Sequence, residues 1–190
     1  DRYASAQQIR RISASLTVGG EEVGSRSGTL VGRDEQLQVL QSCWQAARAG
    51  HAQLVFITGE QGIGKTSLAQ HAAVLDKPPV LLVSRCQEVR GAPAYQLFAN
   101  VLQAYLKMIP AQELDESTCR LIGNFVSLVP EIQQGLPEGV IPPPLEPRQE
   151  QRRLITSVTR FIEWATRQQP WYIILDDVQW ADESSLRLLH

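Results

Sequence analysis

The chain has 190 residues, of which 43% are hydrophobic and 20% are charged, and its formal net charge is -2. This length suits one globular domain, or one domain with a tail, and the composition excludes global disorder. The charge gives no support for broad binding to nucleic acid, which usually requires a basic excess. No apolar run reaches the roughly 20 residues of a membrane-spanning helix, so we expect no membrane partner.

Cysteine usage and the chain ends add two expectations. Cys43, Cys86 and Cys119 lie far apart and form no metal-binding spacing. Their odd number and low density favour reduced thiols in a cytoplasmic protein. The chain starts at Asp1 without a signal-peptide pattern and ends inside an amphipathic pattern, so we expect a fragment of a longer protein.

The first residues predict a short helical tail. Apolar and small side chains recur at helical spacing over residues 3–16, so we interpret residues 1–16 as a linker helix or the end of a preceding domain. Residues 17–29 are rich in Gly, Ser and charge and predict a flexible linker. The globular domain is expected over residues 30–190, incomplete at its C-terminal end.

From residue 30 onward, apolar runs of strand length alternate with amphipathic helical patterns. This alternation is typical of an α/β domain with a parallel sheet and helices on both faces, whose ligands bind at the carboxyl ends of the strands. The expected strands are residues 53–58, 78–85 and 171–177. The expected helices are residues 34–50, 65–75, 94–109, 116–129 (a weaker pattern) and 148–169, with the start of another at residue 181 and a proline-rich loop over 136–147.

A glycine-rich segment follows the first of these strands and fits the pattern GxxxxGK[ST] of a P-loop, or Walker A motif. A glycine-rich turn that merely links a strand to a helix is the alternative, but the lysine and hydroxyl at fixed offsets argue against it. Glycines allow several backbone N–H groups to approach phosphates, and the following helix directs its positive end to the same place. The expected phosphate-binding residues are Gly59, Glu60, Gln61, Gly62, Ile63, Gly64, Lys65, Thr66 and Ser67.

Within this loop, Lys65 is expected to reach the β- and γ-phosphates, and the Thr66 hydroxyl to ligate Mg²⁺. The two acids that end the apolar run WYIILDD supply the second half of such a site. Asp176 is the candidate Walker B ligand of Mg²⁺, and Asp177 the candidate acid that polarises the attacking water. Two acids that only begin a solvated loop are the alternative, since Asp is favoured in turns.

Three segments together resemble one family: LVGRDEQL (residues 30–37), the P-loop, and IILDDVQWADESSLRLL (residues 173–189). The chain resembles the AAA-type ATPase module described as Orc1-like, close to the STAND-class signal-transduction ATPases of large bacterial regulators. The resemblance implies that Val31 and Gly32 lie against adenine and that Arg33 supports that loop. It points to ATP rather than GTP.

The resemblance leaves some residues without a chemical role. Asp34 is expected to cap the following helix. Trp180 and Asp182 belong to the QWAD string of the family, and packing is the favoured interpretation of Trp180.

The partners implied by the resemblance are other domains of the same chain, namely kinase, cyclase or transcription-regulator modules. The opening residues DRYASAQQIRRI also resemble the end of a serine/threonine kinase domain, which suggests a kinase–ATPase fusion, although an ordinary linker helix fits nearly as well. The favoured function is the ATP-binding, slowly ATP-hydrolysing core of a regulatory switch. A nucleotide-binding segment of a DNA-associated transcription regulator and a degenerate P-loop scaffold are the alternatives, with no direct nucleic-acid binding expected from this segment.

Overall fold

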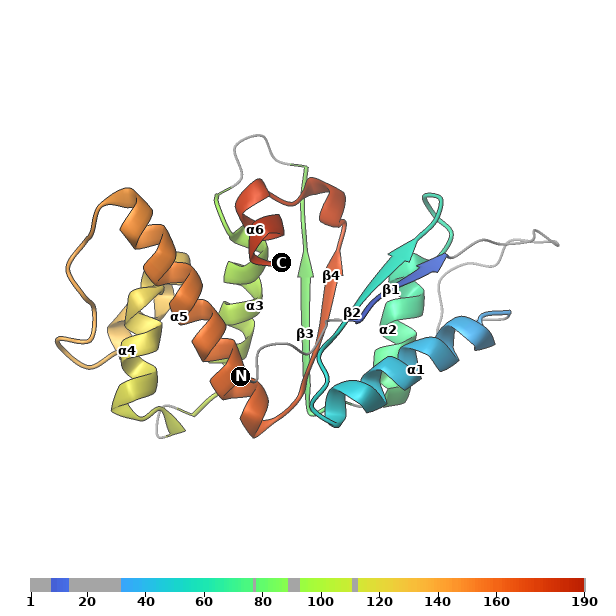
Figure 1. Cartoon of the computed structure of the whole chain (residues 1–190), viewed down its shortest axis with the longest axis horizontal. Coiled ribbons are helices and arrows are strands. Elements are labelled where there is room, and N and C mark those ends of the chain that lie inside the picture. Colours follow the sequence, from blue (N-terminus) through green and yellow to red (C-terminus); the bar gives the residue numbers. More distant parts are fainter. Residues whose placement is uncertain (1–7, 14–31, 77, 89–92, 111–112, 190) are drawn as a thin grey trace. The chain divides into compact units, whose positions relative to one another are not determined.

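The computed structural model describes residues 8–13, 32–76, 78–88, 93–110 and 113–189 (Figure 1). The chain divides into two compact units, the N-terminal unit Asp1–Pro79 and the C-terminal unit Val80–His190. Each unit combines helices with a pair of parallel strands. The predicted α/β class with parallel strands is therefore confirmed.

The N-terminal unit contains a two-stranded parallel sheet and two helices. Its elements are β1 (Gln8–Ser13), α1 (Asp34–Arg48), β2 (Gln53–Thr58) and α2 (Lys65–Asp76). β1 pairs with β2 in a register that matches Gln8 to Gln53 and Ser13 to Thr58. α1 contacts both β2 and α2.

The helical tail predicted for the first residues is wrong where the structure describes it. Residues Gln8–Ser13 form the strand β1, not a helix. The backbone N–H and C=O groups of β2 offer a partner for this segment, and pairing with a neighbouring strand overrides weak local helix propensity. The rest of residues 1–16 and the predicted linker 17–29 lie outside the described residues.

The N-terminal unit has a small core where α1 and α2 meet the sheet. Its buried members are Leu37 and Leu40 of α1 with Leu68 and Ala72 of α2, and Val39, Val55 and Ile57 pack against them. α1 forms because its apolar side chains recur on one face, and it ends at Arg48, just before Gly50, which has a positive φ of 91°. β2 was predicted to be a buried strand, but its side chains are only half-buried or exposed because the described sheet has one partner strand.

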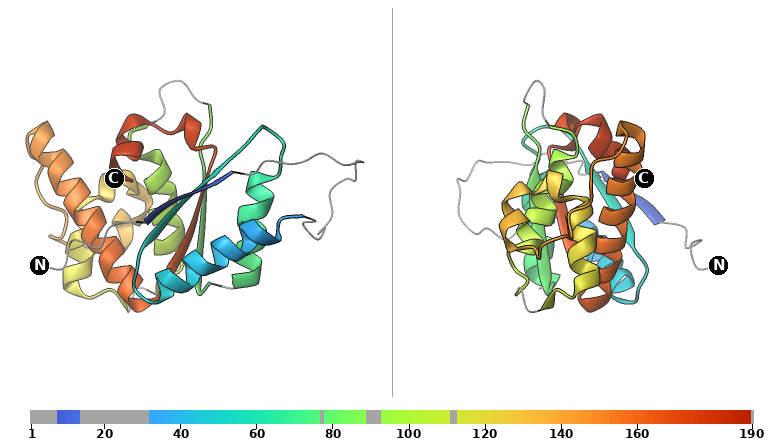
Figure 2. Two further views of the ribbon diagram at one scale, coloured as in Figure 1. Left: turned by 45° about the vertical axis from the view of Figure 1, so that its right-hand side comes forward. Right: turned by 90° about the vertical axis from the view of Figure 1, so that its left-hand side faces the viewer.

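The C-terminal unit contains the second parallel strand pair and most of the helices. Its strands are β3 (Val80–Arg85) and β4 (Trp171–Asp176), and its α-helices are α3 (Gln96–Leu106), α4 (Glu116–Asn124), α5 (Pro147–Gln168) and α6 (Glu183–Leu188). The short 3₁₀ segments are η2 (Val126–Leu128), η3 (Pro130–Gly135) and η4 (Val178–Trp180). α3 contacts β3, and α4 lies beside α5, as both views of Figure 2 show.

The core of the C-terminal unit is much larger and is rich in aromatic side chains. Phe161 of α5 is fully buried, with Phe125, Trp164 and Tyr105 around its ring at centroid distances of 5.3, 5.6 and 6.1 Å. The buried cluster also includes Val80, Leu82, Tyr95, Val101, Leu102, Ile122, Val129, Leu154, Val158 and Ala165. This core holds β3 against the helices.

Several predicted boundaries shift at proline or glycine. β3 begins at Val80 rather than residue 78, because Pro78 and Pro79 lack the N–H that a strand ladder uses. The weak helix predicted over residues 116–129 ends at Asn124 and continues as η2. α5 starts with Pro147, whose ring presets φ for the first helical turn, and it ends before Pro170.

Candidate functional site

The glycine-rich segment of the N-terminal unit is the turn that joins β2 to α2. β2 ends at Thr58, α2 begins at Lys65, and the loop lies between them. Gly62 and Gly64 have φ values of 81° and 89°, in the left-handed region where an L side chain is strained. Glycine is therefore required by the path of this loop, as the motif predicts.

Lys65 is the first residue of α2, and its side chain turns back over the loop. Lys65 Nζ donates hydrogen bonds to the carbonyl oxygens of Gly59 at 3.1 Å and of Glu60 at 2.8 Å, so the ammonium lies over the loop. The first turn of α2 carries no acidic residue. Backbone N–H groups at a helix N-terminus, together with an ammonium group, are the donor set that binds phosphate. The residues present therefore fit the phosphates of a nucleotide.

Arg33 is buried behind this loop. Its side chain is 3% exposed, and its Nη2 donates a hydrogen bond of 2.7 Å to the carbonyl oxygen of Ile63 in the P-loop. Within the described residues, its Nη1 is buried without a hydrogen-bond partner. Arg33 therefore braces the P-loop directly, a contact that sequence reasoning did not place.

Of the other residues predicted near the adenine, the structure describes only Gly32. Gly32 has a φ of 74° and is exposed, and Val31 lies outside the described residues. Asp34 is the first residue of α1 rather than its cap: the N-cap position is Arg33, whose side chain makes no capping bond. Asp34 therefore acts as an acid in the first turn of the helix, which favours the positive end of the helix dipole.

The two predicted acids lie at the carboxyl end of β4 in the C-terminal unit. Asp176 is the last residue of β4, and Asp177 follows in the left-handed conformation, with φ 55° and ψ 39°. The P-loop residues belong to the N-terminal unit, and the two acids belong to the C-terminal unit.

Arg85, the last residue of β3, is the functional neighbour that sequence reasoning missed. Its Nη2 and Nε lie 2.7 and 3.1 Å from Asp176 Oδ2, and its Nε lies 3.6 Å from Asp177 Oδ2. The parallel register pairs Arg85 with Asp176, which brings both side chains to one edge of the sheet. The hydrogen bond and the charge of Asp176 raise the pKa of the Arg85 guanidinium. The sequence did carry a signal for this ion pair, since each of the two parallel strands ends in a charged residue.

The QWAD string, residues 179–182, ends η4 and supplies the N-cap of α6. Asp182 is the N-cap of α6, and its carboxylate accepts hydrogen bonds from Ser185 N at 2.8 Å and Ser185 Oγ at 2.6 Å. It also accepts a bond of 2.9 Å from the backbone N–H of Tyr95, just before α3. Burial pushes the pKa of Asp182 upward, but the bonds from Ser185 and Tyr95 outweigh this effect and lower it. Trp180 is 45% exposed, so the packing role predicted for it is not seen.

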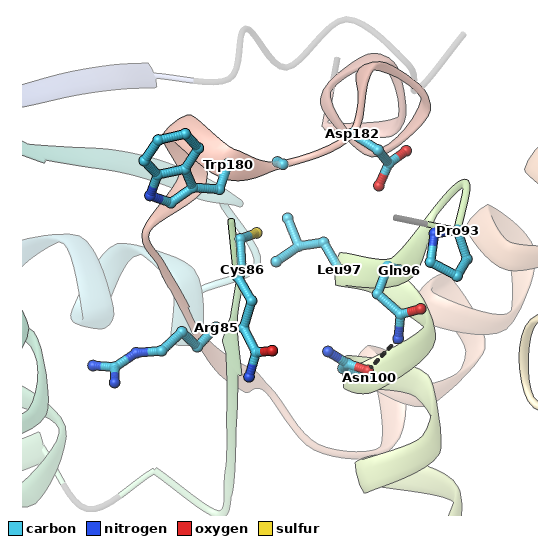
Figure 3. Close-up of a pocket in the computed structure, with 10 residues that line it drawn as sticks. Arg85, Cys86, Pro93, Gln96, Leu97, Asn100, Trp180 and Asp182 are labelled. Atoms are coloured by element: carbon cyan, nitrogen blue, oxygen red, sulfur yellow. Dashed lines mark hydrogen bonds between the residues drawn. The ribbon is translucent and has the colours of Figure 1, made fainter. Parts of the chain in front are cut away.

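A pocket of about 320 Å³ lies between the end of β3, the start of α3 and the QWAD segment (Figure 3). Cys86 and Leu97 face it, and Gln96 Nε2 donates a bond of 2.8 Å to Asn100 Oδ1 along its wall. Burial raises the pKa of the Cys86 thiol, and the carboxylates of Asp182, Asp177 and Asp176 raise it further. The three cysteines form no disulfide, as predicted.

The chemistry of the two acids suits Mg²⁺. Among the residues that the structure describes, no three His, Cys, Asp or Glu side chains gather closely enough to hold a metal ion by themselves. Mg²⁺ is usually held by only one or two carboxylates together with substrate phosphates and water. Asp176 and Asp177 therefore fit a metal that arrives with a nucleotide.

Comparison with protein families matches residues 29–190 to the AAA ATPase domain. The chain therefore belongs to the AAA ATPase domain family, and its fold is that of a P-loop NTPase. The comparisons with curated proteins and with solved structures gave no significant match. No helix in the described part of the chain is long and apolar enough to cross a membrane.

Proposed function

We propose that the chain is the ATP-binding, slowly ATP-hydrolysing core of a regulatory signal-transduction switch. The observation that carries this proposal is the P-loop itself. Its glycines take left-handed conformations between β2 and α2, and Lys65 lies over the loop. Membership of the AAA ATPase domain family supports adenine as the base.

The proposed roles follow the motif positions. Lys65 binds the β- and γ-phosphates, and Thr66 and Asp176 ligate Mg²⁺. Asp177 polarises the attacking water. When bound, Mg²⁺ neutralises charge on the phosphate oxygens. Gly32 and Val31 contact the adenine, while Arg33 holds the P-loop through Ile63.

We assign the chain to the STAND-class, Orc1-like branch, within a longer cytoplasmic protein. Its partners in this proposal are kinase, cyclase or transcription-regulator domains of the same chain. Nucleotide exchange and slow hydrolysis then bias the conformational equilibrium that those domains share. The support is the combination of the VGRD, P-loop and DDVQWAD strings.

The test is calorimetric titration with ATP, ADP and GTP, each with and without Mg²⁺. We expect binding of adenine nucleotides that Lys65→Ala weakens by roughly 10- to 100-fold or more, because a charge-assisted phosphate contact is lost. Lys107→Ala is the matched control, since Lys107 is an exposed lysine that follows α3. Equal ATP affinity in Lys65→Ala and wild type would refute the site, and tighter GTP binding would refute the adenine assignment.

A further inference from the structure

The segment from Asp177 to Asp182 links the acids of β4 to α6, and it begins with a residue in the left-handed conformation. Asp177 has a φ of 55°, and Tyr95, which precedes α3, has a φ of 64°. Among the described residues these are the two non-glycine positions with a left-handed φ. Such conformations persist only where the surroundings hold them in place, and they cluster at functional sites.

A single carboxylate holds the far end of this segment. Asp182 Oδ1 accepts hydrogen bonds from the N–H groups of Tyr95 at 2.9 Å and Ser185 at 2.8 Å. Asp182 Oδ2 accepts a bond of 2.6 Å from Ser185 Oγ, and Ser185 is fully buried. Asp182 therefore connects α6 to the start of α3, two elements that are separate in the chain.

The near end of the segment is held at the acids. Arg85 Nε lies 3.6 Å from Asp177 Oδ2. The carbonyl oxygen of Asp177 accepts a bond of 3.0 Å from Trp180 N, and Gln179 Nε2 lies 3.3 Å from Asp177 Oδ1. The backbone between the two anchors is the short 3₁₀ segment η4 followed by Ala181.

We propose that Asp182 is a positioning residue that fixes Asp177 by anchoring the segment between them to the start of α3. The catalytic importance of this position rests on the proposed function, in which Asp177 polarises water. The anchoring also couples α3 to the acids: a displacement of the start of α3 shifts the backbone of Asp177. The QWAD string thereby acquires a physical role, since its aspartate ties the acids to a distant helix.

Asp115 provides a matched control because it is an ordinary helix cap. It is the N-cap of α4, and its Oδ1 accepts bonds from Thr118 N at 2.7 Å and Ser117 Oγ at 2.9 Å. These bonds stay within the helix that Asp115 caps, whereas Asp182 also accepts one from Tyr95. If Asp182 were also only a local cap, replacing Asp182 or Asp115 with alanine would loosen only the helix that each residue caps.

Hydrogen exchange separates the two roles. In Asp182→Ala we expect exchange to rise roughly fivefold to 30-fold in the amides of residues 95–99 and of residues 178–181, as well as in α6. Asp115→Ala should raise exchange in α4 alone. Asp182→Asn keeps Oδ1 as an acceptor and is expected to restore most of the protection. If Asp182→Ala does not fold, Asp182→Ser is compared with Asp115→Ser, because serine can still cap its own helix but is shorter and offers a single acceptor oxygen.

Two results would overturn the proposal. One is a rise in Asp182→Ala confined to α6; the other is unchanged exchange at residues 178–181. Calorimetry with ADP on the same proteins tests the proposed function separately. If the wild-type protein fails to bind ADP, the proposed function is contradicted. The exchange data still decide the role of Asp182. ADP affinity within about twofold of wild type in Asp182→Ala supports an effect on the acids rather than on the P-loop.

Discussion

The two units present their functional groups in opposite ways. In the N-terminal unit the loop acts through its backbone: glycines with left-handed φ, a helix N-terminus, and the buried Arg33 behind them. Among the residues that the structure describes, its buried cluster has four members. In the C-terminal unit the candidate groups are side chains: Asp176 is paired with Arg85, and the cluster of buried residues has thirteen members among the described residues.

This difference follows from what each group must do. A phosphate cradle needs N–H groups spaced along one continuous stretch of backbone, so a local sequence can build it with little core behind it. A pair of carboxylates needs counter-charges and hydrogen-bond donors from other segments, because uncompensated acids close together repel one another. Those segments meet only where a larger core brings them together.

The largest expected effect is a loss of folding stability when a core side chain is removed, and it tests the difference between the two cores. Phe161→Ala should destabilise the C-terminal unit by about 3–5 kcal/mol, since a fully buried ring leaves a cavity among three aromatic neighbours. Leu68→Ala should cost the N-terminal unit about 2–4 kcal/mol, because fewer side chains surround it. Hydrogen exchange under denaturant, read segment by segment, measures both.

Leu75→Ala is the control for Leu68, because Leu75 lies on the same helix and is 47% exposed. Its effect should stay within about 0.5 kcal/mol. Equal costs for Leu68→Ala and Leu75→Ala would show that the small core of the N-terminal unit does not stabilise it.

A smaller effect is expected at Arg33 and tests whether the P-loop depends on a side chain at all. Arg33→Ala leaves the Ile63 carbonyl oxygen without its donor and should cost about 1–3 kcal/mol. Arg33→Lys should be intermediate, because lysine lacks the planar fork. Thermal unfolding and ADP calorimetry measure the two consequences. Arg48→Ala, an exposed change in the last turn of α1, is the control; an equal effect of Arg33→Ala and Arg48→Ala would contradict the bracing role.

The smallest expected effect is on how the free energy of unfolding depends on pH. One aspartate in each unit contributes to it, and the two contributions have opposite signs. The pKa of Asp182 is lowered in the folded chain, so its contribution is complete above the ordinary aspartate pKa of about 3.9 and is lost as the pH falls through the folded pKa. Burial raises the pKa of Asp76 in α2, and its Oδ2 is buried without a partner among the described residues. Asp76 therefore opposes folding at neutral pH, and protonation relieves this as the pH falls through its raised pKa.

Melting temperatures from pH 7 to pH 3 test this prediction. At pH 7, Asp76→Asn should raise the melting temperature and Asp182→Asn should lower it. Both differences should shrink toward acid, where the carboxyl groups are protonated. Differences of the same sign at pH 7 would contradict the assignment.

Much of this architecture was predictable because its signals are local. β2 and α2 were placed within about one residue, since an apolar run of strand length and a glycine turn leave few alternatives. β1 was mistaken for a helix, because strand pairing is decided by a partner more than forty positions away in the chain, such as Gln53 for Gln8. Trp180 was expected to pack, but its exposure depends on neighbours that periodicity cannot show.

The sequence by itself determined the P-loop, its flanking strand and helix, and the two acids after an apolar run, because these depend on the order of residues along a few turns of chain. The tertiary structure alone decided that Arg85 pairs with Asp176, that Arg33 braces Ile63, and that Asp182 reaches Tyr95. These partners are 91, 30 and 87 positions apart. Hydrogen bonds and ion pairs act over a few ångströms, so they exist only after folding has brought such distant residues together.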